Sequence, residues 1–443
     1  MSRNGCELLL TLIYLSGTVV AVIMLWVIFQ SRRYHLPDKL LLFSIGITPL
    51  GKLVYLPIPG FYGLKVTFIV SIFSGIVWFV IRGFSHRAAK LLILCCVAGI
   101  SLGWLEDPNW LGLYKYVEKA GFDAGNETGT TESAALRLLA FAFLILYSGS
   151  VSTAAKRQAE LLSVMASYFV VSTIAASIIG VAIFIGVWFG SFTVEDLAPI
   201  SVDSHILEGQ VNFYRFNPGS NVNEFSMILA FAIFLLFFVT WRSWLVILVG
   251  SFFSLCMIAT LTRSSWIGIV LGLSFAVLIA SKNRSHFYAV TIGYAMLVLC
   301  VVTLYSISDD LRSLIDTRLA FDIGVSGDER LEKYSYVINR LSNDPLRLLF
   351  GYGWSTNLYV HSVFFQLLYE IGAVGTLIFF TVVAYFCRGL FSTPAGRYKI
   401  AIISALVFIA ISAAMHHTLY HVQTWFMLGF ISGYISVFTK DLK

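Results

Sequence analysis

Hydrophobic residues along the chain gather into long runs separated by shorter polar segments. The runs fall at residues 8–29, 40–57, 64–81, 89–105, 134–150, 163–188, 225–240, 244–260, 265–280, 287–305, 362–387, 400–415 and 423–438. A helix needs about 20 apolar residues to cross the hydrocarbon core of a bilayer. The pattern therefore predicts an all-α, polytopic transmembrane helix bundle of about 12–13 spans, some short enough for one to be re-entrant. The first run is too long for a signal peptide and is expected to be the first span.

Basic residues divide the loops into two sets. The set that includes Arg32, Arg82, Lys156 and Lys440 holds 16 basic and three acidic residues, whereas the rest of the chain holds 14 basic and 21 acidic residues. By the positive-inside rule the first set is cytoplasmic. We then expect three outer loops, at 106–133, 189–224 and 306–361, the last partly helical and carrying part of the functional site.

Composition excludes several classes of protein. Apolar residues make up 58% of the chain and charged residues 12%, whereas soluble domains carry about 25% charged residues. We therefore interpret residues 1–443 as a single integral membrane domain in contact with membrane lipids. The net charge of +6 is explained by topology, so no nucleic-acid partner is expected. The sequence contains no Walker motif for a nucleotide, and the cysteine spacing predicts no metal site.

Two isolated arginines lie beside predicted helix starts on the outer side. Arg215 precedes an Asn-Pro-Gly turn, after which Ser220 or Asn221 is the expected N-cap of a helix. Arg263 lies in the Thr-Arg-Ser turn between two apolar runs, where an unpaired guanidinium is costly. Each has a structural alternative: a snorkelling side chain for Arg215, and a structural partner such as Glu224 for Arg263.

A third cluster begins at His361, near the start of the run at 362–387. The helix dipole there keeps a neutral imidazole available as a base, although a structural histidine is the alternative. In a straight helix, Glu370 falls on the side opposite His361, so the two do not form a direct pair. Gly372 and Gly375 permit close helix packing. Two arginines and a histidine on one side of the membrane favour chemistry on a sugar phosphate or lipid pyrophosphate, because the arginine fork binds phosphate oxygens bidentately.

At these residues the sequence resembles the O-antigen ligase/polymerase superfamily of bacterial envelope glycosyltransferases. The segments that carry the resemblance are Arg215 with the Asn-rich turn after it, Thr262-Arg263-Ser264, Ser326–Arg330, Pro345–Trp354, His361-Ser362 and Glu370–Gly375. Family members commonly have His-Asn where this chain has His361-Ser362, which makes Ser362 a weaker site. The resemblance covers mainly residues 210–375.

The resemblance implies a C-type glycosyltransferase fold without metal or cofactor, in the bacterial inner membrane, with its active site facing the periplasm. It implies that Arg215 and Arg263 hold the pyrophosphate of an undecaprenyl-pyrophosphate-linked oligosaccharide donor. His361 would activate or position the acceptor hydroxyl for inverting attack. Further substrate-binding candidates are Asn221, Asn223, Arg330, Tyr352 and Ser362; for Arg330, a salt-bridged helix with neighbouring acids is an equal alternative.

The acceptor is left open by the resemblance. A polymerase extends another lipid-linked glycan, whereas an O-antigen ligase transfers the glycan to lipid A–core. The local sequence after His361 and the short outer loop favour the polymerase, with a chain-length regulator protein as a further partner. Two other classes compete: a metal-dependent transferase using Glu106-Asp107 or Glu195-Asp196, and a lipid-linked polysaccharide flippase. The cations at outer helix ends, rather than in a central cavity, disfavour the flippase.

Overall fold

The structure of this protein is a computed structural model, and it describes most of the helical part of the chain. The described residues are 3–54, 66–83, 114–117, 129–132, 134–190, 205–208, 211–218, 221–280, 326–352, 360, 362–394, 396–416, 418 and 421–439, with isolated positions between 288 and 312.

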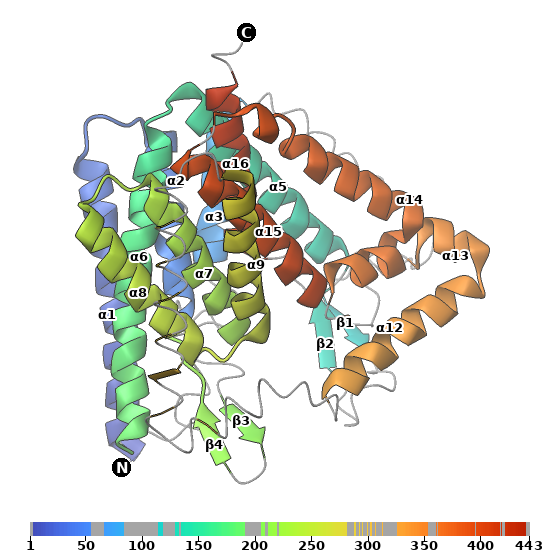
Figure 1. The fold of residues 1–443 in the computed structure, drawn as a ribbon, viewed down its shortest axis with the longest axis horizontal. Coiled ribbons are helices and arrows are strands. Elements are labelled where there is room, and N and C mark those ends of the chain that lie inside the picture. The colour runs from blue at the N-terminus through green and yellow to red at the C-terminus, as the bar shows by residue number, and fades with distance from the viewer. Residues whose placement is uncertain are drawn as a thin grey trace.

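Figure 1 shows a bundle of helices with a triangular extension on one side. The bundle helices are α1 (Arg3–Gln30), α2 (Leu36–Ile47), α3 (Val66–Arg82), α5 (Ala134–Arg157), α6 (Leu161–Trp188), α7 (Val222–Leu235), α8 (Ser243–Ala259), α9 (Arg263–Ala280), α15 (Arg397–Met415) and α16 (Val422–Phe438). The extension contains α12 (Ser326–Ser342), α13 (Pro345–Phe350) and part of α14 (Val363–Phe386). Short 3-10 helices follow α2, α7 and α14, at Thr48–Leu53 (η1), Leu236–Phe238 (η3) and Leu390–Ser392 (η4).

The predicted polytopic helical membrane fold is confirmed. Five described helical segments are long and apolar enough to cross a membrane: Thr11–Gln30, Leu139–Arg157, Leu161–Trp188, Val363–Ser392 and Arg397–Met415. Five shorter apolar helices accompany them. Of the thirteen predicted runs, 89–105 lies outside the described residues, and at 287–305 only isolated helical positions are described.

The second predicted span, 40–57, differs from the expected continuous helix. The α-helix ends at Ile47 and the chain continues as the 3-10 helix η1, in which Gly51 has a positive φ of 53°. Twelve α-helical residues advance about 18 Å, which is too short to cross a core about 30 Å thick. Hydropathy alone did not reveal this break, because apolar residues continue through it.

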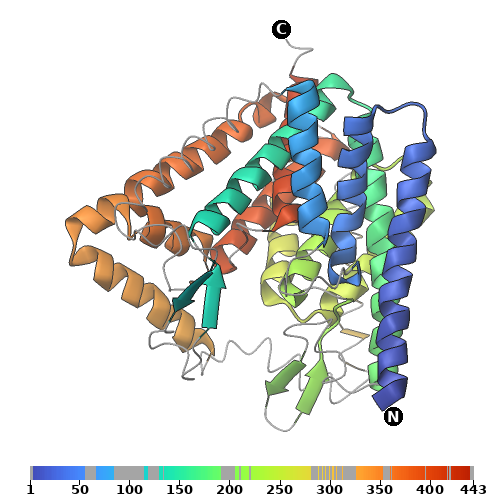
Figure 2. The same ribbon diagram turned by 180° about the vertical axis from the view of Figure 1, so that it is seen from behind.

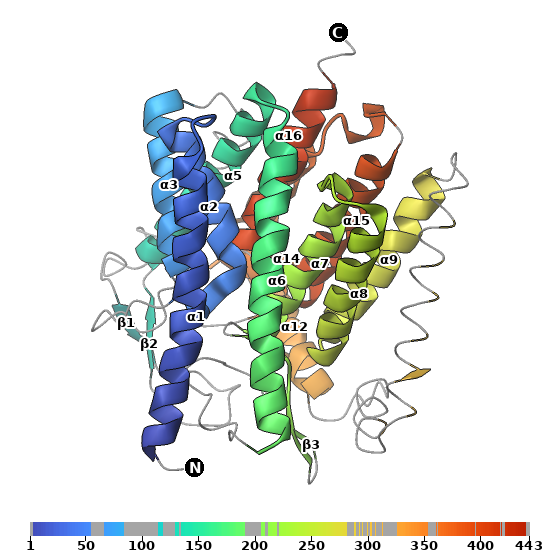
Figure 3. The same ribbon diagram turned by 90° about the vertical axis from the view of Figure 1, so that its left-hand side faces the viewer.

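Two β-hairpins are present: the first lies beside the extension, and the second stands at the end of the bundle opposite the C-terminus (Figures 1 and 3). Strands β1 (Tyr114–Val117) and β2 (Gly129–Glu132) pair antiparallel, as do β3 (His205–Glu208) and β4 (Val211–Tyr214). They belong to two of the segments predicted as outer loops. The N-terminus of α1 lies at this same end of the bundle.

Charged residues predicted to be cytoplasmic meet at the other end. Arg33 forms an ion pair with Glu160, and Arg82 lies 3.8 Å from Asp38. The indole of Trp78 donates to Asp38 at 3.1 Å, while the Arg157 guanidinium lies 5.3 Å from the centre of the Trp78 ring. These contacts join α2, α3, α5 and α6 at a single charged end of the bundle, in agreement with the division of the loops by charge.

Helix α14 is broken at Gly372, where φ is +67° and ψ is −176°. The break fits against Gly351, the residue that ends α13 with φ +79°. A Cβ atom at Gly372 would lie 2.4 Å from the backbone of Leu349, and one at Gly351 would lie 2.3 Å from the carbonyl oxygen of Glu370. Gly372 therefore permits the close packing of helix α13, as predicted, and also breaks α14, which was not predicted.

The apolar residues form two clusters. The larger cluster joins the bundle helices and contains buried aromatic residues such as Phe169, Phe408 and Trp425. The smaller cluster lies in the extension, where Val337 and Leu341 of α12 pack with Val360 and Tyr369. Figure 2 shows this extension from behind, with α12 and α14 meeting at α13. The described residues of the segment predicted as an outer loop, 306–361, are thus partly helical, as predicted, and share a small core with Tyr369 of α14.

Replacing Gly372 by alanine is expected to destabilise the extension. The new Cβ would have to occupy the backbone of Leu349 and adopt a positive φ, which alone costs about 1–3 kcal/mol. Thermal unfolding of the purified protein in detergent, followed by tryptophan fluorescence, measures the change. Gly83→Ala is the matched control, because Gly83 has φ +61° but a Cβ added there would meet no atom within 4 Å. Equal unfolding temperatures for the two variants would contradict the interlocked backbones.

Candidate functional site

The turn between α8 and α9 is held by the Arg215 side chain. Its Nε donates to the carbonyl oxygen of Thr260 at 2.9 Å, and one terminal nitrogen donates to the hydroxyl of Thr262 at 3.1 Å. Between these partners Leu261 has a positive φ of 54°, a conformation that is rare for a bulky residue. Such strain persists only where surrounding contacts enforce it, so Arg215 stabilises a turn that the local sequence disfavours.

Helix α7 joins the same turn through its first residues. Asn221 is the N-cap, as predicted, because its side chain accepts from the backbone N–H of Asn223 at 2.9 Å. The side chain of Asn223 in turn lies 3.5 Å from the Thr262 hydroxyl. Both asparagines of the motif therefore fix the start of α7 against the turn that Arg215 holds.

The serines that follow Arg263 are tied to other helices. Ser264 Oγ lies 2.6 Å from Nε2 of His416, the residue that caps the end of α15. Ser265 Oγ lies 2.6 Å from the hydroxyl of Ser226 on α7. The hydroxyls beside Arg263 thus make structural contacts that position the turn.

Arg263 itself is the exception. Its Nε is buried and has no hydrogen-bond partner within the described part of the chain. None of the ion pairs among the described residues joins it to Glu224, the structural partner considered from the sequence. A buried polar group without a partner costs about 1–3 kcal/mol, and more when it is charged. The structure thus places a guanidinium whose Nε has no described partner at the first residue of α9.

His416 is a residue that motif reasoning missed. It reaches Ser264 because α9 and α15 pack closely: a Cβ at Gly272 of α9 would lie 2.8 Å from the carbonyl oxygen of Ser404 on α15. One available signal was the polar His-His-Thr segment at 416–418 between two apolar runs. Its proximity to Arg263 depends on helix packing, which the sequence pattern does not give.

His361, the predicted acceptor-side residue, lies outside the described residues, but both its neighbours are described. The backbone N–H of Val360 donates to Oε1 of Gln366 at 2.8 Å, and the amide nitrogen of Gln366 donates to Glu370 at 2.8 Å. Ser362 is buried and is the N-cap residue of α14. The backbone on either side of His361 is therefore anchored to the first half of the broken helix.

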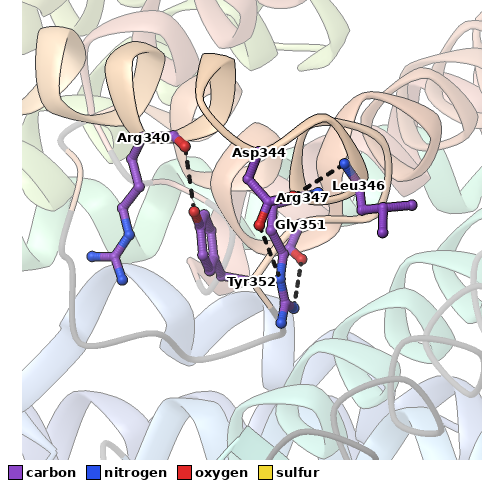
Figure 4. A network of polar contacts seen from close by, with 6 residues as sticks. All are labelled: Arg340, Asp344, Leu346, Arg347, Gly351 and Tyr352. Atoms are coloured by element: carbon purple, nitrogen blue, oxygen red, sulfur yellow. Dashed lines mark hydrogen bonds and ion pairs between the residues drawn. The ribbon is translucent and has the colours of Figure 1, made fainter.

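Tyr352 belongs to a separate polar network on the extension, shown in Figure 4. Its hydroxyl donates to the carbonyl oxygen of Arg340 at 3.3 Å, and the guanidinium carbons of Arg340 and Arg347 lie 4.8 and 5.3 Å from its ring centre. Burial lowers the pKa of Arg340, but hydrogen bonds to Tyr336 and Tyr352 outweigh it and raise the pKa overall. No described contact joins this network to Arg215 or Arg263. Arg330 lies in α12, and its side chain is not among those described.

The described site can act on a ligand through electrostatic interaction. A fixed guanidinium at a helix start can bind an anion and stabilise charge that develops on a leaving group. Among the described residues, no group of three or more His, Cys, Asp or Glu side chains could hold a metal ion. The acidic pairs Glu106-Asp107 and Glu195-Asp196 lie outside the described residues.

Comparison with known proteins gives a family match. Residues 248–380 match the O-antigen ligase family, and the matched region contains Arg263, Tyr352 and His361. The resemblance to the O-antigen ligase/polymerase superfamily is confirmed. Arg215, Asn221 and Asn223 precede the matched region, although Arg215 and Asn223 contact its Thr262 directly.

One curated relative is the ComP-specific O-oligosaccharyltransferase of Acinetobacter baylyi. It is 23% identical over 266 residues, an alignment that covers 52% of this chain and 47% of the relative. The chain therefore spans about half the length of the relative it matches.

Substituting Arg215 by lysine is expected to loosen the α8–α9 turn. A single ammonium cannot reproduce the planar fork that reaches Thr260 and Thr262 together. Hydrogen–deuterium exchange of peptides covering residues 259–266 measures the effect, and we expect exchange faster by about tenfold, the loss of one charged hydrogen bond. Arg242→Lys, which precedes the other end of α8, is the control and is expected to leave this turn unchanged. Unaltered exchange in Arg215→Lys would show that the strained turn does not depend on the guanidinium.

Proposed function

We propose that this chain is a metal-independent, inverting glycosyltransferase of the bacterial inner membrane. It transfers a glycan from undecaprenyl pyrophosphate to an acceptor hydroxyl at the periplasmic face. The observation that carries the proposal is the buried Nε of Arg263, which has no partner among the described residues and lies within the region that matches the O-antigen ligase family.

The donor side of the reaction is assigned to the two arginines. Arg263 binds the pyrophosphate, and its fixed charge stabilises the negative charge that grows on the leaving group as the bond to the anomeric carbon breaks. Arg215 holds the turn that presents Arg263 and adds to the positive potential there. A guanidinium fits this task because it stays protonated and its planar fork matches phosphate oxygens.

The acceptor side is assigned to His361. The acceptor hydroxyl attacks the anomeric carbon in line with the departing pyrophosphate, and the imidazole takes or orients the hydroxyl proton. Proton transfer of this kind contributes typically about 10²–10⁴-fold to a rate. Asn221 and Asn223 set the start of α7, while Arg330, Tyr352 and Ser362 remain proposed contacts with the glycan.

The orientation in the membrane supports a periplasmic site. Arg215 directly follows the β3–β4 hairpin, which lies at the end of the bundle opposite the C-terminus. The charged contacts of Arg33, Arg82 and Arg157 lie at the other end, which the positive-inside rule assigns to the cytoplasm.

For the acceptor, we place ligase-type transfer first. The matched family is described as O-antigen ligase and the relative's name is that of an oligosaccharyltransferase, so both comparisons favour transfer to an acceptor outside the growing glycan. The local sequence after His361 favours a polymerase, which is the second candidate.

Arg263→Lys and Arg215→Lys are each expected to lower transfer by about tenfold or more. Lysine keeps the charge but loses the fork, and a charged hydrogen bond contributes about 1.5–3 kcal/mol. Transfer is measured with purified variants and a lipid-linked donor, and Arg242→Lys again serves as the control. Near-normal transfer by both variants would refute the assignment of the pyrophosphate to this site.

The acceptor is identified by reconstitution with a purified lipid-linked repeat unit, with and without lipid A–core. We expect product only when lipid A–core or another added acceptor is present, and unchanged activity in EDTA. A ladder of longer glycans without added acceptor would instead identify a polymerase.

In cells lacking the native gene, His361→Ala is expected to leave unused donor on the outer leaflet; donor retained on the inner leaflet would indicate a flippase.

A further inference from the structure

The short helix α13 exposes an apolar surface at the tip of the extension. Leu346 is 69% exposed, Leu348 39%, Leu349 44% and Phe350 52%. A soluble loop outside the membrane does not need four neighbouring apolar side chains in water, and such patches mark contact with a partner or a membrane. On α12, Leu331 and Ile338 are also exposed, whereas Val337 and Leu341 face the extension's own core.

Helix α14 gives the depth at which this tip lies. The α13 backbone meets α14 at the Gly372 break, nine residues into an apolar segment that is long enough to cross a membrane. From Gly372 to Arg388, which we place at the cytoplasmic surface, the chain advances at most about 24 Å as a helix. The hydrocarbon core is about 30 Å thick, so the break and the α13 backbone that contacts it lie inside the core, below its outer surface.

Charged and aromatic side chains beside the tip have the chemistry of a membrane interface. Figure 4 shows Arg340 and Arg347 on either side of Tyr352, and the Tyr336 hydroxyl accepts from Arg340. Arginines near apolar surface extend their guanidinium groups toward lipid headgroups, and tyrosines concentrate at the same level. Exposed apolar side chains beside two cations complement a leaflet of lipids with phosphate headgroups.

We propose that α13 is embedded in the outer leaflet and that Arg340 and Arg347 bind phospholipid headgroup phosphate beside Tyr352. The outer segment 306–361 then re-enters the membrane at α13 and anchors the extension to the lipid surface. This inference rests on the proposed orientation of the chain in the membrane, but it does not depend on the transferase activity, because it concerns lipid contact alone.

Photocrosslinking of the full chain in nanodiscs of phosphatidylglycerol and phosphatidylcholine tests the embedding. The photoreactive residue p-benzoylphenylalanine replaces Leu349 in one variant and Glu332, an exposed residue on α12, in the control. After irradiation, intact-protein mass spectrometry is expected to show at least about tenfold more phospholipid adduct at position 349, because acyl chains exclude water from apolar surface. Equal adducts at both positions, or a crosslinked dimer in place of lipid adduct, overturns the embedding.

Native mass spectrometry tests the phosphate contact separately. Removing both charges by Arg340→Gln with Arg347→Gln is expected to lower retained phosphatidylglycerol by about fivefold for each cation. The matched variant Arg340→Lys with Arg347→Lys keeps both charges and is expected to retain the lipid. Unchanged retention in the glutamine variant overturns the headgroup assignment, even where the crosslinking result supports embedding.

Discussion

The hydrogen bonds from Arg215 to the α8–α9 turn are the contacts on which the rest of the site depends. They hold Leu261 in a left-handed conformation and so determine where α9 begins. Because α9 begins there, Arg263 is its first residue and Ser264 and Ser265 face different neighbouring helices. The Arg215 guanidinium thus fixes a strained turn, and this turn determines the position of the Arg263 guanidinium.

The polar groups around the turn hold it in place. Thr262, Ser264 and Ser265 each contact a side chain from another part of the chain, and such satisfied networks hold one arrangement because an unmade bond in a low-dielectric interior is costly. These contacts hold the turn without using the Nε of Arg263. Close packing of α9 on α15 completes the arrangement by placing His416 at Ser264.

Much of this architecture could be predicted from the sequence. Apolar runs located the described spans, charge separated the two ends of the bundle, and the Asn221 cap followed from its side-chain chemistry. Arg263 could be identified as a candidate because it is an isolated charge between two apolar runs. The breaks at Gly51 and Gly372 could not be predicted, because hydropathy reports burial in lipid and carries no information on φ.

Contacts between distant segments were also beyond the pattern. His416 and Ser264 meet only through helix packing, and Arg215 reaches Thr260 because the chain returns after a hairpin. The charged residues of the segment that contains α13 predict a loop outside the membrane. The structure instead places the α13 backbone against Gly372, within the apolar helix α14.

The contact between Gly351 and Gly372 has an evolutionary consequence. Each glycine leaves room for backbone beside the other, so a mutation at one removes the selective reason to keep the other. The two positions are expected to be inherited as one character: lineages keep both or lose both. In a relative that has both glycines, the sequence alone then predicts that the span corresponding to α14 is divided in two. In a relative that lacks both, the sequence predicts a continuous helix and a different attachment of the outer segment.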